Sequence, residues 1–171
     1  MTLVYVGVGS NIDRHKHVEA AVCELKKLGD QLRLSTVYES PSQGFRSEAF
    51  FNLVIEMQTD LSLSAFTGML KDIERNWGRQ PDAQKYQDRT LDLDIILFGD
   101  VVSDEAPQLP RQDIYQYPFV IQPLFELCPD LLLPGDGRSV RQIWLEADNL
   151  EVLKPVEFWF TKTNFPNVKS K

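Results

Sequence analysis

Four stretches of this chain have the residue patterns of β-strands. Residues 3–8 form a run of β-favouring residues. In the other three, residues 32–38, 50–57 and 91–98, the side chains alternate between two faces, which is the spacing typical of strands. In the last of them, one face is apolar throughout and is formed by Leu91, Leu93, Ile95 and Leu97. The other face begins with two carboxylates and ends with two apolar side chains, in the order Asp92, Asp94, Ile96 and Phe98. This asymmetry predicts a strand with a core side and a side that is available for chemistry.

Two longer stretches carry apolar residues three and four positions apart, which predicts amphipathic helices. Residues 18–28 form the first, with Gly29 placed to end it, and residues 63–77 form the second. Shorter helices are expected around 121–127 and 139–147. The order strand, helix, strand, strand, helix, strand is that of an α+β, ferredoxin-like fold, a mostly antiparallel sheet with helices packed on one face. The other face would then be free to carry a site.

Length and charge narrow the class of protein. A chain of 171 residues is long enough for a single domain with a substantial core, which we expect over residues 1–150, and residues 151–171 would be a C-terminal extension. Phe158 and Trp159 suggest an added strand or a clamp over an apolar patch. The formal net charge of −7 argues against a nucleic-acid binder. No apolar stretch reaches transmembrane length and no signal peptide is evident, so we expect no membrane partner and a cytoplasmic location.

The cysteines and histidines carry no obvious chemistry. Cys23 and Cys128 are far apart in apolar settings, so we expect buried, reduced thiols. His15 and His17 lie at the first helix, and we expect surface positions for both. Neither a nucleophilic triad nor a cysteine metal set can be assembled from these residues.

Asp92 and Asp94 are the first chemical signal. Side chains two apart on a strand lie on the same side, roughly 6.5–7 Å apart. Two carboxylates held that close need a cation nearby, or one of them must protonate. Oxygen ligands without His or Cys suit magnesium, which binds through one or two carboxylates plus substrate phosphates. The alternative is a pair of solvated charges that protect an edge strand from aggregation.

Basic residues cluster in sequence around this pair. Arg79, Lys85 and Arg89 lie in the polar stretch 78–90 that leads into it, and Arg111 follows it. Phosphoryl-type transfer combines a metal that bridges phosphate oxygens, cations that hold developing charge, and a lid that excludes water. No G-x-x-x-x-G-K-[ST] motif is present, which excludes a P-loop kinase.

The strand at 50–57 offers a second kind of site. Its core side is formed by Phe51, Leu53, Ile55 and Met57, and Phe50 and Asn52 lie together on the other side. An aromatic ring beside an amide can stack on a flat heterocycle and hydrogen-bond its edge. Equally, Phe50 could pack under the neighbouring loop and Asn52 could bond to backbone.

Several motifs together carry a family resemblance. In chain order they are Gly9-Ser10-Asn11, Tyr38-Glu39-Ser40-Pro41, Phe50-Phe51-Asn52, Gly78-Arg79, the run from Arg89 to Gly99, Pro118-Phe119 and Pro123-Leu124. With these motifs the chain resembles the 6-hydroxymethyl-7,8-dihydropterin pyrophosphokinases of folate biosynthesis. The resemblance implies a ferredoxin-like fold, ATP as co-substrate, two Mg²⁺ ions, a pterin substrate and a monomer. The β,γ-pyrophosphoryl group of ATP would pass to the pterin hydroxymethyl oxygen, and AMP would be released.

The resemblance also implies roles for individual residues. The expected catalytic residues are Arg79, Arg89, Asp92 and Asp94, of which Asp92 and Asp94 bind metal. The expected pterin-binding residues are Ser40, Gln43, Phe50, Asn52 and Phe119, with the two phenylalanine rings sandwiching the pterin. The expected ATP-binding residues are Lys71, Glu74, Arg79, Arg89, Ile95 and Arg111. A solvated helix face is the alternative for Lys71.

Four positions depart from the family pattern on the ATP side. Pro81 and Tyr86 stand where the family usually has an arginine and a tryptophan, Arg111 follows Pro110 in place of a histidine, and Tyr117 replaces another arginine. These departures predict weaker ATP binding or a slower rate than in a typical member. They also leave open a paralogue that binds pterin or nucleotide without turnover. A second alternative, suggested by the fold, is a ferredoxin-like RNA-binding domain that stacks bases on aromatic side chains of the sheet.

Overall fold

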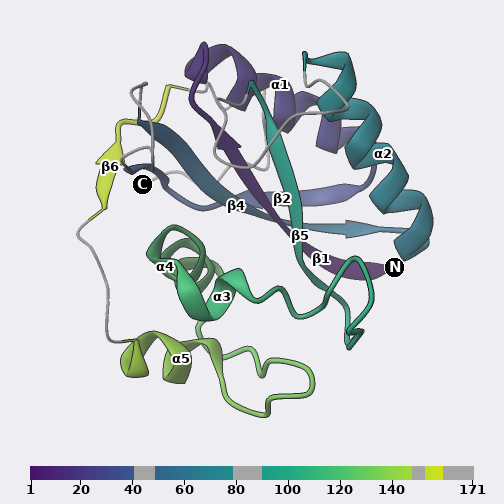
Figure 1. Ribbon diagram of the computed structural model, residues 1–171, viewed down its shortest axis with the longest axis vertical. Helices are drawn as coiled ribbons and strands as arrows, with labels where there is room; N and C mark the ends of the chain where they lie inside the picture. The colour runs from purple at the N-terminus through teal and green to yellow at the C-terminus, as the bar shows by residue number, and fades with distance from the viewer. Residues whose placement is uncertain (41–48, 79–89, 148–152, 160–171) are drawn as a thin grey trace.

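The computed structural model describes residues 1–40, 49–78, 90–147 and 153–159 (Figure 1). Within these residues, six strands form one antiparallel sheet in the order β5–β1–β4–β3–β6, and β2 also pairs with β4. The strands are β1 (Thr2–Ser10), β2 (Asp30–Leu34), β3 (Val37–Ser40), β4 (Phe50–Thr59), β5 (Asp92–Phe98) and β6 (Lys154–Val156). The four predicted strands are therefore present, and β6 is added at one edge.

The predicted strand 32–38 is divided into β2 and β3, which lie one after the other along β4. Ser35 lies at the break between them. Its backbone N–H donates to the Val54 carbonyl at 2.9 Å, and its hydroxyl accepts from the Val54 N–H at 2.9 Å. Because the side-chain oxygen replaces a backbone carbonyl in the ladder, the chain can change register here without an unpaired amide in β4.

Two helices cover one face of the sheet, as predicted (Figure 1). They are α1 (Arg14–Lys26) and α2 (Leu63–Asn76). The Ser62 hydroxyl caps α2 by accepting from the Ala65 N–H at 3.1 Å. Their apolar sides, including Leu25 and Phe66, pack on the strand residues predicted to face the core, such as Leu53 and Ile55. This is the larger of the two cores.

The second face is not left open along its whole length. The helices α3 (Asp113–Gln116), α4 (Pro118–Leu127) and α5 (Val140–Glu146) lie on this side (Figure 1). A second core forms where Leu124 of α4 packs near Tyr5, Val54 and Leu97. The short helix α3 was not predicted. The part of this face beyond the second core is where the candidate site lies.

A β-bulge in β5 overturns part of the predicted alternation. Val6 pairs with Ile95 and Tyr5 with Leu97, so that Ile96 is the extra residue. Up to Ile95 the apolar side faces α1 and α2, but Leu97 turns toward α4, while the Phe98 ring lies 6.0 Å from that of Phe66 in the larger core. The faces predicted for these last two residues were wrong, because a bulge shifts the side-chain period by one residue.

The predictions for the cysteines and histidines were correct only in part. Both cysteines are free thiols, but Cys23 is exposed and Cys128 is half-buried, where burial raises the pKa of its thiol to about 12. His15 is exposed, as predicted. His17 is buried instead, with Nδ1 2.7 Å from the Ile12 carbonyl oxygen and 3.2 Å from that of Asp13. Its imidazole has polar partners where the chain enters α1, so burial leaves the ring nitrogen satisfied.

The segment 153–159 joins the sheet and then reaches α1. In β6, Val156 pairs with Val37 of β3, as expected for an added strand. Beyond it, the Trp159 indole N–H donates to Glu19 of α1 at 2.7 Å. None of the helices in the described residues has the length and apolar character to cross a membrane.

Candidate active site

One row of paired residues across the sheet links the predicted metal site at Asp92 with the predicted heterocycle site at Asn52. Asp92 of β5 pairs with Gly9 of β1, Gly9 pairs with Asn52 of β4, and Asn52 pairs with Tyr38 of β3. Since neighbouring strands lie about 4.8 Å apart, Asp92 and Asn52 are separated by about 10 Å across Gly9. Residues from distant parts of the sequence thus form one continuous surface on the face that carries α4.

Two glycines of β1 let neighbouring side chains lie close to the sheet. A Cβ atom at Gly9 would lie 3.1 Å from the Asn52 Oδ1, and one at Gly7 would lie 3.1 Å from the Ile96 Cδ1. Glycine at these positions therefore gives the Asn52 and Ile96 side chains the space that they occupy. Two glycines spaced two apart, on one face of a predicted strand, are a usable sequence signal for this close packing, although the sequence-based prediction of the site did not include them.

Asp92 and Asp94 lie side by side on this face, as predicted, opposite Gly9 and Gly7. Burial, and then repulsion by Asp92, raises the pKa of Asp94 to about 7. The nearby Arg111 guanidinium acts in the other direction and does not compensate. Because burial and a neighbouring carboxylate both disfavour the ionised form of Asp94, a cation bound beside it would be favoured.

Arg111 reaches the pair from outside the strand. Its backbone N–H donates to the Ile96 carbonyl at 3.1 Å, which aligns residue 111 with β5 just past the aspartates. Its guanidinium lies 3.4 Å from the Asp94 Oδ1, and its Nε donates to Asp113 Oδ2 at 3.1 Å. The structure places Arg111 beside Asp94, and it adds Asp113, which no sequence pattern had indicated. The contact of Arg111 with ATP stays a prediction.

The donor atoms of this cluster fit magnesium. In the parts of the chain that the structure describes, no group of three or more His, Cys, Asp or Glu side chains forms a metal site. Two carboxylates alone cannot complete a coordination shell. Magnesium is commonly held in this way, through one or two carboxylates with substrate phosphates and water as the other ligands.

The amide at the other end of the row is held in place by a hydroxyl. The Asn52 Nδ2 donates to the Ser40 Oγ at 2.8 Å, and both residues are buried. Phe50, which pairs with Ser40, is half-buried on the same face. The structure thus brings together three of the predicted pterin residues, and the bond from Asn52 goes to a side chain and not to backbone.

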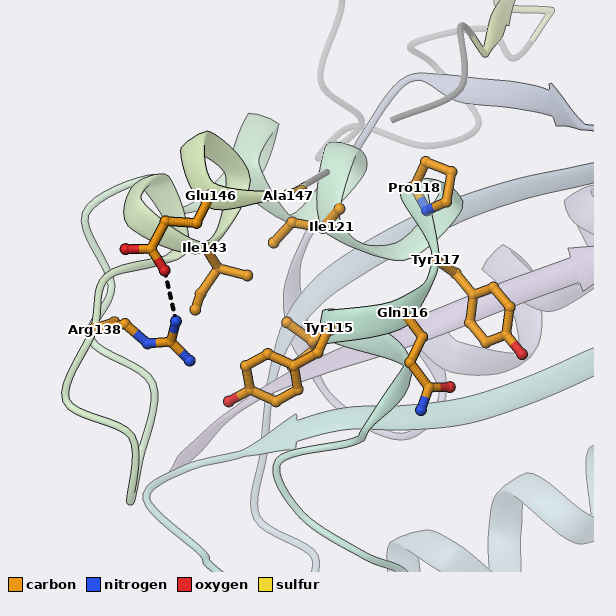
Figure 2. Close-up of a pocket in the computed structure, with 10 residues that line it drawn as sticks. Tyr115, Gln116, Tyr117, Pro118, Ile121, Arg138, Ile143, Glu146 and Ala147 are labelled. Carbon is orange, nitrogen blue, oxygen red and sulfur yellow. Dashed lines mark hydrogen bonds and ion pairs between the residues drawn. The ribbon is translucent and has the colours of Figure 1, made fainter. Parts of the chain in front are cut away.

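Phe119 lies on the same side of the sheet, at the start of α4. Its ring stacks on that of Tyr117, with 5.0 Å between centroids and 23° between planes. Figure 2 shows Tyr117 at the junction between α3 and α4. Tyr117, at a position where the resemblance predicted an arginine in the family, therefore contacts Phe119 through its aromatic ring. A pterin sandwich between Phe50 and Phe119 stays a prediction.

Three predicted ATP residues do not lie on this face. Glu74 of α2 is buried and accepts from the backbone N–H of Leu93 at 2.7 Å, so it bonds to β5 between the two aspartates, and its charge is one of those that raise the pKa of Asp94. The Ile95 side chain packs in the core beneath α1 and α2. Lys71 is exposed on α2. The ATP contacts of these residues stay predictions. Gln43, Arg79 and Arg89, together with the departures at Pro81 and Tyr86, lie outside the described residues.

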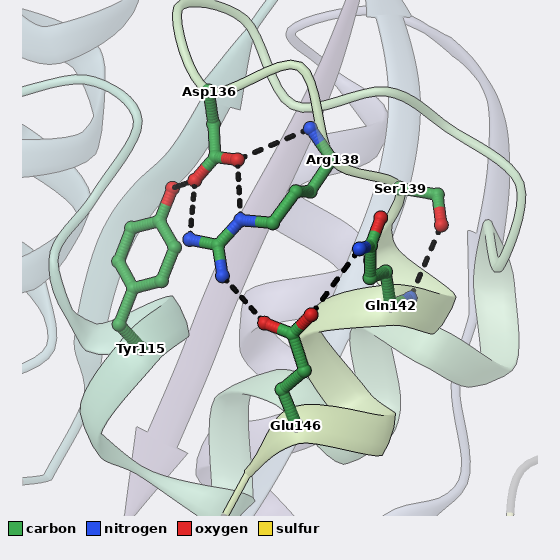
Figure 3. A network of polar contacts seen from close by, with 6 residues as sticks. All are labelled: Tyr115, Asp136, Arg138, Ser139, Gln142 and Glu146. Atoms are coloured by element: carbon green, nitrogen blue, oxygen red, sulfur yellow. Dashed lines mark hydrogen bonds and ion pairs between the residues drawn. The ribbon is translucent and has the colours of Figure 1, made fainter.

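A second polar cluster supports α3 from its other end (Figure 3). The Tyr115 hydroxyl donates to Asp136 Oδ2 at 2.9 Å. Arg138 donates to both oxygens of Asp136, at 2.7 and 2.8 Å, and to Glu146 Oε1 at 2.7 Å. A hollow of about 260 Å³ lies between α3, α4 and α5, and Arg138 and Glu146 form one of its walls (Figure 2). The cluster fixes the helix that begins with Asp113.

Sequence comparison identifies the family. The family model of 7,8-dihydro-6-hydroxymethylpterin-pyrophosphokinase (HPPK) matches residues 5–129. The chain belongs to this family. It is 31% identical to the 2-amino-4-hydroxy-6-hydroxymethyldihydropteridine pyrophosphokinase of Aquifex aeolicus over 137 residues, which cover 78% of this chain and 85% of the relative. It is 32% identical to the enzyme of the same name from Haemophilus influenzae over 140 residues, covering 79% and 87%.

Solved structures show the same fold. The crystal structure of Plasmodium falciparum HPPK-DHPS matches with a TM-score of 0.65 at 11% identity, over 85% of this chain and 43% of that one. The similarity confirms the predicted α+β, ferredoxin-like architecture. HPPK family membership supports pyrophosphoryl transfer from ATP to hydroxymethyldihydropterin in folate synthesis. Nothing in these similarities favours a member that binds without turnover.

Proposed function

We propose that this HPPK family member transfers the β,γ-pyrophosphoryl group of ATP to 6-hydroxymethyl-7,8-dihydropterin across the row formed by Asp92, Gly9 and Asn52. One observation carries the proposal: a carboxylate pair and an amide that is held by a hydroxyl lie on one face of the sheet, on either side of Gly9. The first suits the metal-bound phosphates of ATP and the second suits the edge of a heterocycle. Their separation of about 10 Å leaves room for both substrates to meet over Gly9.

The pterin would lie at the Asn52 end. The fixed Asn52 amide and the Ser40 hydroxyl would hydrogen-bond its edge, with Gln43 as a further predicted partner. Phe50 and Phe119 would contact its faces, because aromatic rings stack favourably on flat heterocycles. The chain would thus hold the hydroxymethyl group in a fixed direction, toward the aspartates.

The triphosphate would lie at the Asp92 and Asp94 end. We propose that these two carboxylates hold two Mg²⁺ ions, which neutralise phosphate charge when bound. Arg111 would contact phosphate oxygens, with Arg79 and Arg89 as further predicted phosphate contacts. Lys71, Glu74 and Ile95 are the other residues predicted to line the ATP site. Binding and orientation by these residues suit a reaction that depends mainly on positioning and electrostatics.

The bond changes follow from this placement. The pterin hydroxymethyl oxygen forms a bond to the β-phosphorus of ATP. The bond between that phosphorus and the oxygen leading to the α-phosphorus breaks, AMP leaves with the electron pair, and the hydroxyl proton passes to solvent. Holding the two substrates in line is the main contribution of the chain.

The proposal also covers the domain organisation, the oligomeric state and the location of the protein. We infer a single domain over residues 1–171, a 1–150 core with 151–171 as an extension, because β6 pairs with β3 and Trp159 bonds to α1. A monomer in the cytoplasm, with small molecules as its partners, completes the prediction.

Nucleotide product analysis tests the function directly. The protein would be incubated with ATP, Mg²⁺ and 6-hydroxymethyl-7,8-dihydropterin, beside Asp94→Ala and the control Asp60→Ala. Asp60 is a matched control because its side chain is 82% exposed and lies in the turn after β4. We expect AMP from the native chain and the control, and none from Asp94→Ala. ADP as the product would contradict the reaction, and the absence of AMP at high enzyme concentration would favour a binding-only member.

A further inference from the structure

Arg14, the first residue of α1, bridges the ends of two strands. Its Nη1 donates to Glu39 Oε2 of β3 at 2.7 Å and to the carbonyl oxygen of Ala49, just before β4, at 2.9 Å. Its guanidinium carbon lies 4.0 Å from the ring centroid of Phe51. The side chain is only 17% exposed. One cation therefore joins β3, β4 and α1 at a single point.

This point lies directly beneath the proposed pterin residues. Ser40 follows Glu39 in β3 and pairs with Phe50, whereas Glu39 pairs with Phe51. Successive side chains on a strand point to opposite faces, so Ser40 and Phe50 face the site while Glu39 and Phe51 face α1. Arg14 consequently contacts the sequence neighbours of the site residues from the other side of the sheet, and does not itself face the substrate.

The contacts of Arg14 include two types of interaction that are stronger than an ordinary hydrogen bond or apolar contact. A hydrogen bond between a guanidinium and a carboxylate is charge-assisted, and low exposure protects it from screening by salt. The planar cation also stacks on the Phe51 ring, which adds a cation–π contribution. A change in the spacing of β3 and β4 would break these contacts, so Arg14 resists such a change.

Two further rings contact Phe51, one from α1 and one from the C-terminal segment. The Phe51 ring centroid lies 5.1 Å from that of His15 and 5.8 Å from that of Trp159. Trp159 is itself fixed by its bond to Glu19. The start of β4 is thereby held by Arg14 and by a ring from residue 159, although neither belongs to the family motifs.

We propose that Arg14 is a positioning residue for pterin recognition. By setting the spacing between the end of β3 and the start of β4, it sets where Ser40, Phe50 and Asn52 stand relative to one another. The inference rests on the proposed function, because it takes the pterin to bind at these three residues. Its loss would weaken pterin binding and leave the phosphate end of the row unchanged.

Steady-state kinetics of Arg14→Ala, Arg14→Lys and Glu39→Gln test the proposal. For Arg14→Ala we expect the KM for pterin to rise about tenfold, corresponding to the loss of a charge-assisted hydrogen bond of about 1.4 kcal/mol. The KM for ATP should stay within about twofold. Arg14→Lys keeps the charge but cannot stack as a plane, so it should recover part of the loss. Glu39→Gln should give an intermediate increase, because the contact to Ala49 is retained.

Arg33→Ala is the matched control. Arg33 also forms an arginine–glutamate ion pair, with Glu56 of β4 at 2.9 Å, but it joins two strands at the end of the sheet away from the site. It should leave both KM values unchanged. If Arg14→Ala fails to fold, Arg14→Lys and Glu39→Gln still decide the question through the pterin KM.

The outcomes separate this inference from the proposed function. An equal rise in the KM for pterin and for ATP, or an unchanged pterin KM in all three variants, would overturn the positioning role. A native chain that forms no AMP would overturn the proposed function instead. A pterin-specific rise in Arg14→Ala that Arg14→Lys partly reverses would support both.

Discussion

Two charge clusters lie at the short helix α3. Both combine arginine with carboxylates, but the pKa of a carboxylate is lowered in one cluster and raised in the other. In the first, Arg138 forms a fork of two bonds to Asp136 and a third bond to Glu146. Its hydrogen bonds lower the pKa of Asp136. In the second, Arg111 lies 3.4 Å from Asp94 and bonds to Asp113, and the pKa of Asp94 is raised to about 7.

The difference lies in charge balance and burial. Around Arg138, the carboxylates are matched by closely bonded donors, and the cluster is complete as it stands. Around Arg111, burial and the neighbouring Asp92 raise the pKa of Asp94, because both disfavour its ionised form. The first cluster stabilises the fold, whereas a buried carboxylate beside a like charge has unfavourable electrostatic energy that a bound cation can relieve.

The contributions of the two carboxylates to folding stability therefore change with pH in opposite directions. The lowered pKa of Asp136 contributes stability above its ordinary value of 3.8, and that stability is lost as the pH falls below it. The raised pKa of Asp94 makes its protonated form the favoured one in the folded chain. Its contribution is thus most favourable below 3.8 and declines as the pH rises to about 7.

The largest expected effect comes from Asp94→Asn. We expect the rate of AMP formation to fall about 10³-fold. Asp94 is one of the two carboxylates proposed to hold Mg²⁺, and its loss would remove several kcal/mol of transition-state stabilisation. Thermal unfolding without metal, measured about one pH unit above the raised pKa, should show a Tm no lower than that of the native chain, because the substitution removes an unfavourable charge. A large drop in this Tm would show that Asp94 serves the fold, as Asp136 does.

Arg111→Ala should affect binding and not folding. We expect the KM for ATP to rise about tenfold, which is typical for the loss of a hydrogen bond to a charged group. Steady-state kinetics with saturating pterin would measure it. An unchanged KM for ATP would remove Arg111 from the phosphate site.

Magnesium binding should depend on pH through Asp94. With its pKa at about 7, the proton competes with the metal below that pH. Calorimetric titration with Mg²⁺ should show an affinity that falls by up to about tenfold per pH unit below the pKa and levels off above it. Asp94→Asn provides the reference, since it cannot titrate. An affinity that is independent of pH between roughly 5 and 8 would contradict the raised pKa.

The smallest effect is expected from Arg138→Ala. The variant leaves Asp136 and Glu146 without their shared partner, so the Tm should fall slightly. The KM values for ATP and pterin should not change, because the cluster touches α3 from the end away from Asp94. A change in the KM for ATP comparable to that of Arg111→Ala would mean that the two clusters act as one.

Sequence reasoning located most of the elements because their patterns are local. The alternation in 50–57 and 91–95 and the helical spacing in 63–77 each lie within one stretch of chain, and each is present in the structure. The bulge at Ile96 escaped prediction because it depends on the register with β1. The buried position of His17 depends on two carbonyl oxygens at the start of α1 that no pattern of apolar residues indicates.

For the site, the sequence alone was sufficient to identify the family motifs and to place Asp92 and Asp94 on the face opposite the core. Only the tertiary structure decided which residues would join them. Gly9 lies between Asp92 and Asn52, Arg111 lies beside Asp94, and Arg14 lies beneath Ser40, because strand pairing and helix packing bring together residues far apart in the chain. A side chain's face follows from its immediate neighbours in sequence, whereas its charge balance is a sum over every group that packs near it, and that sum exists only in the folded chain.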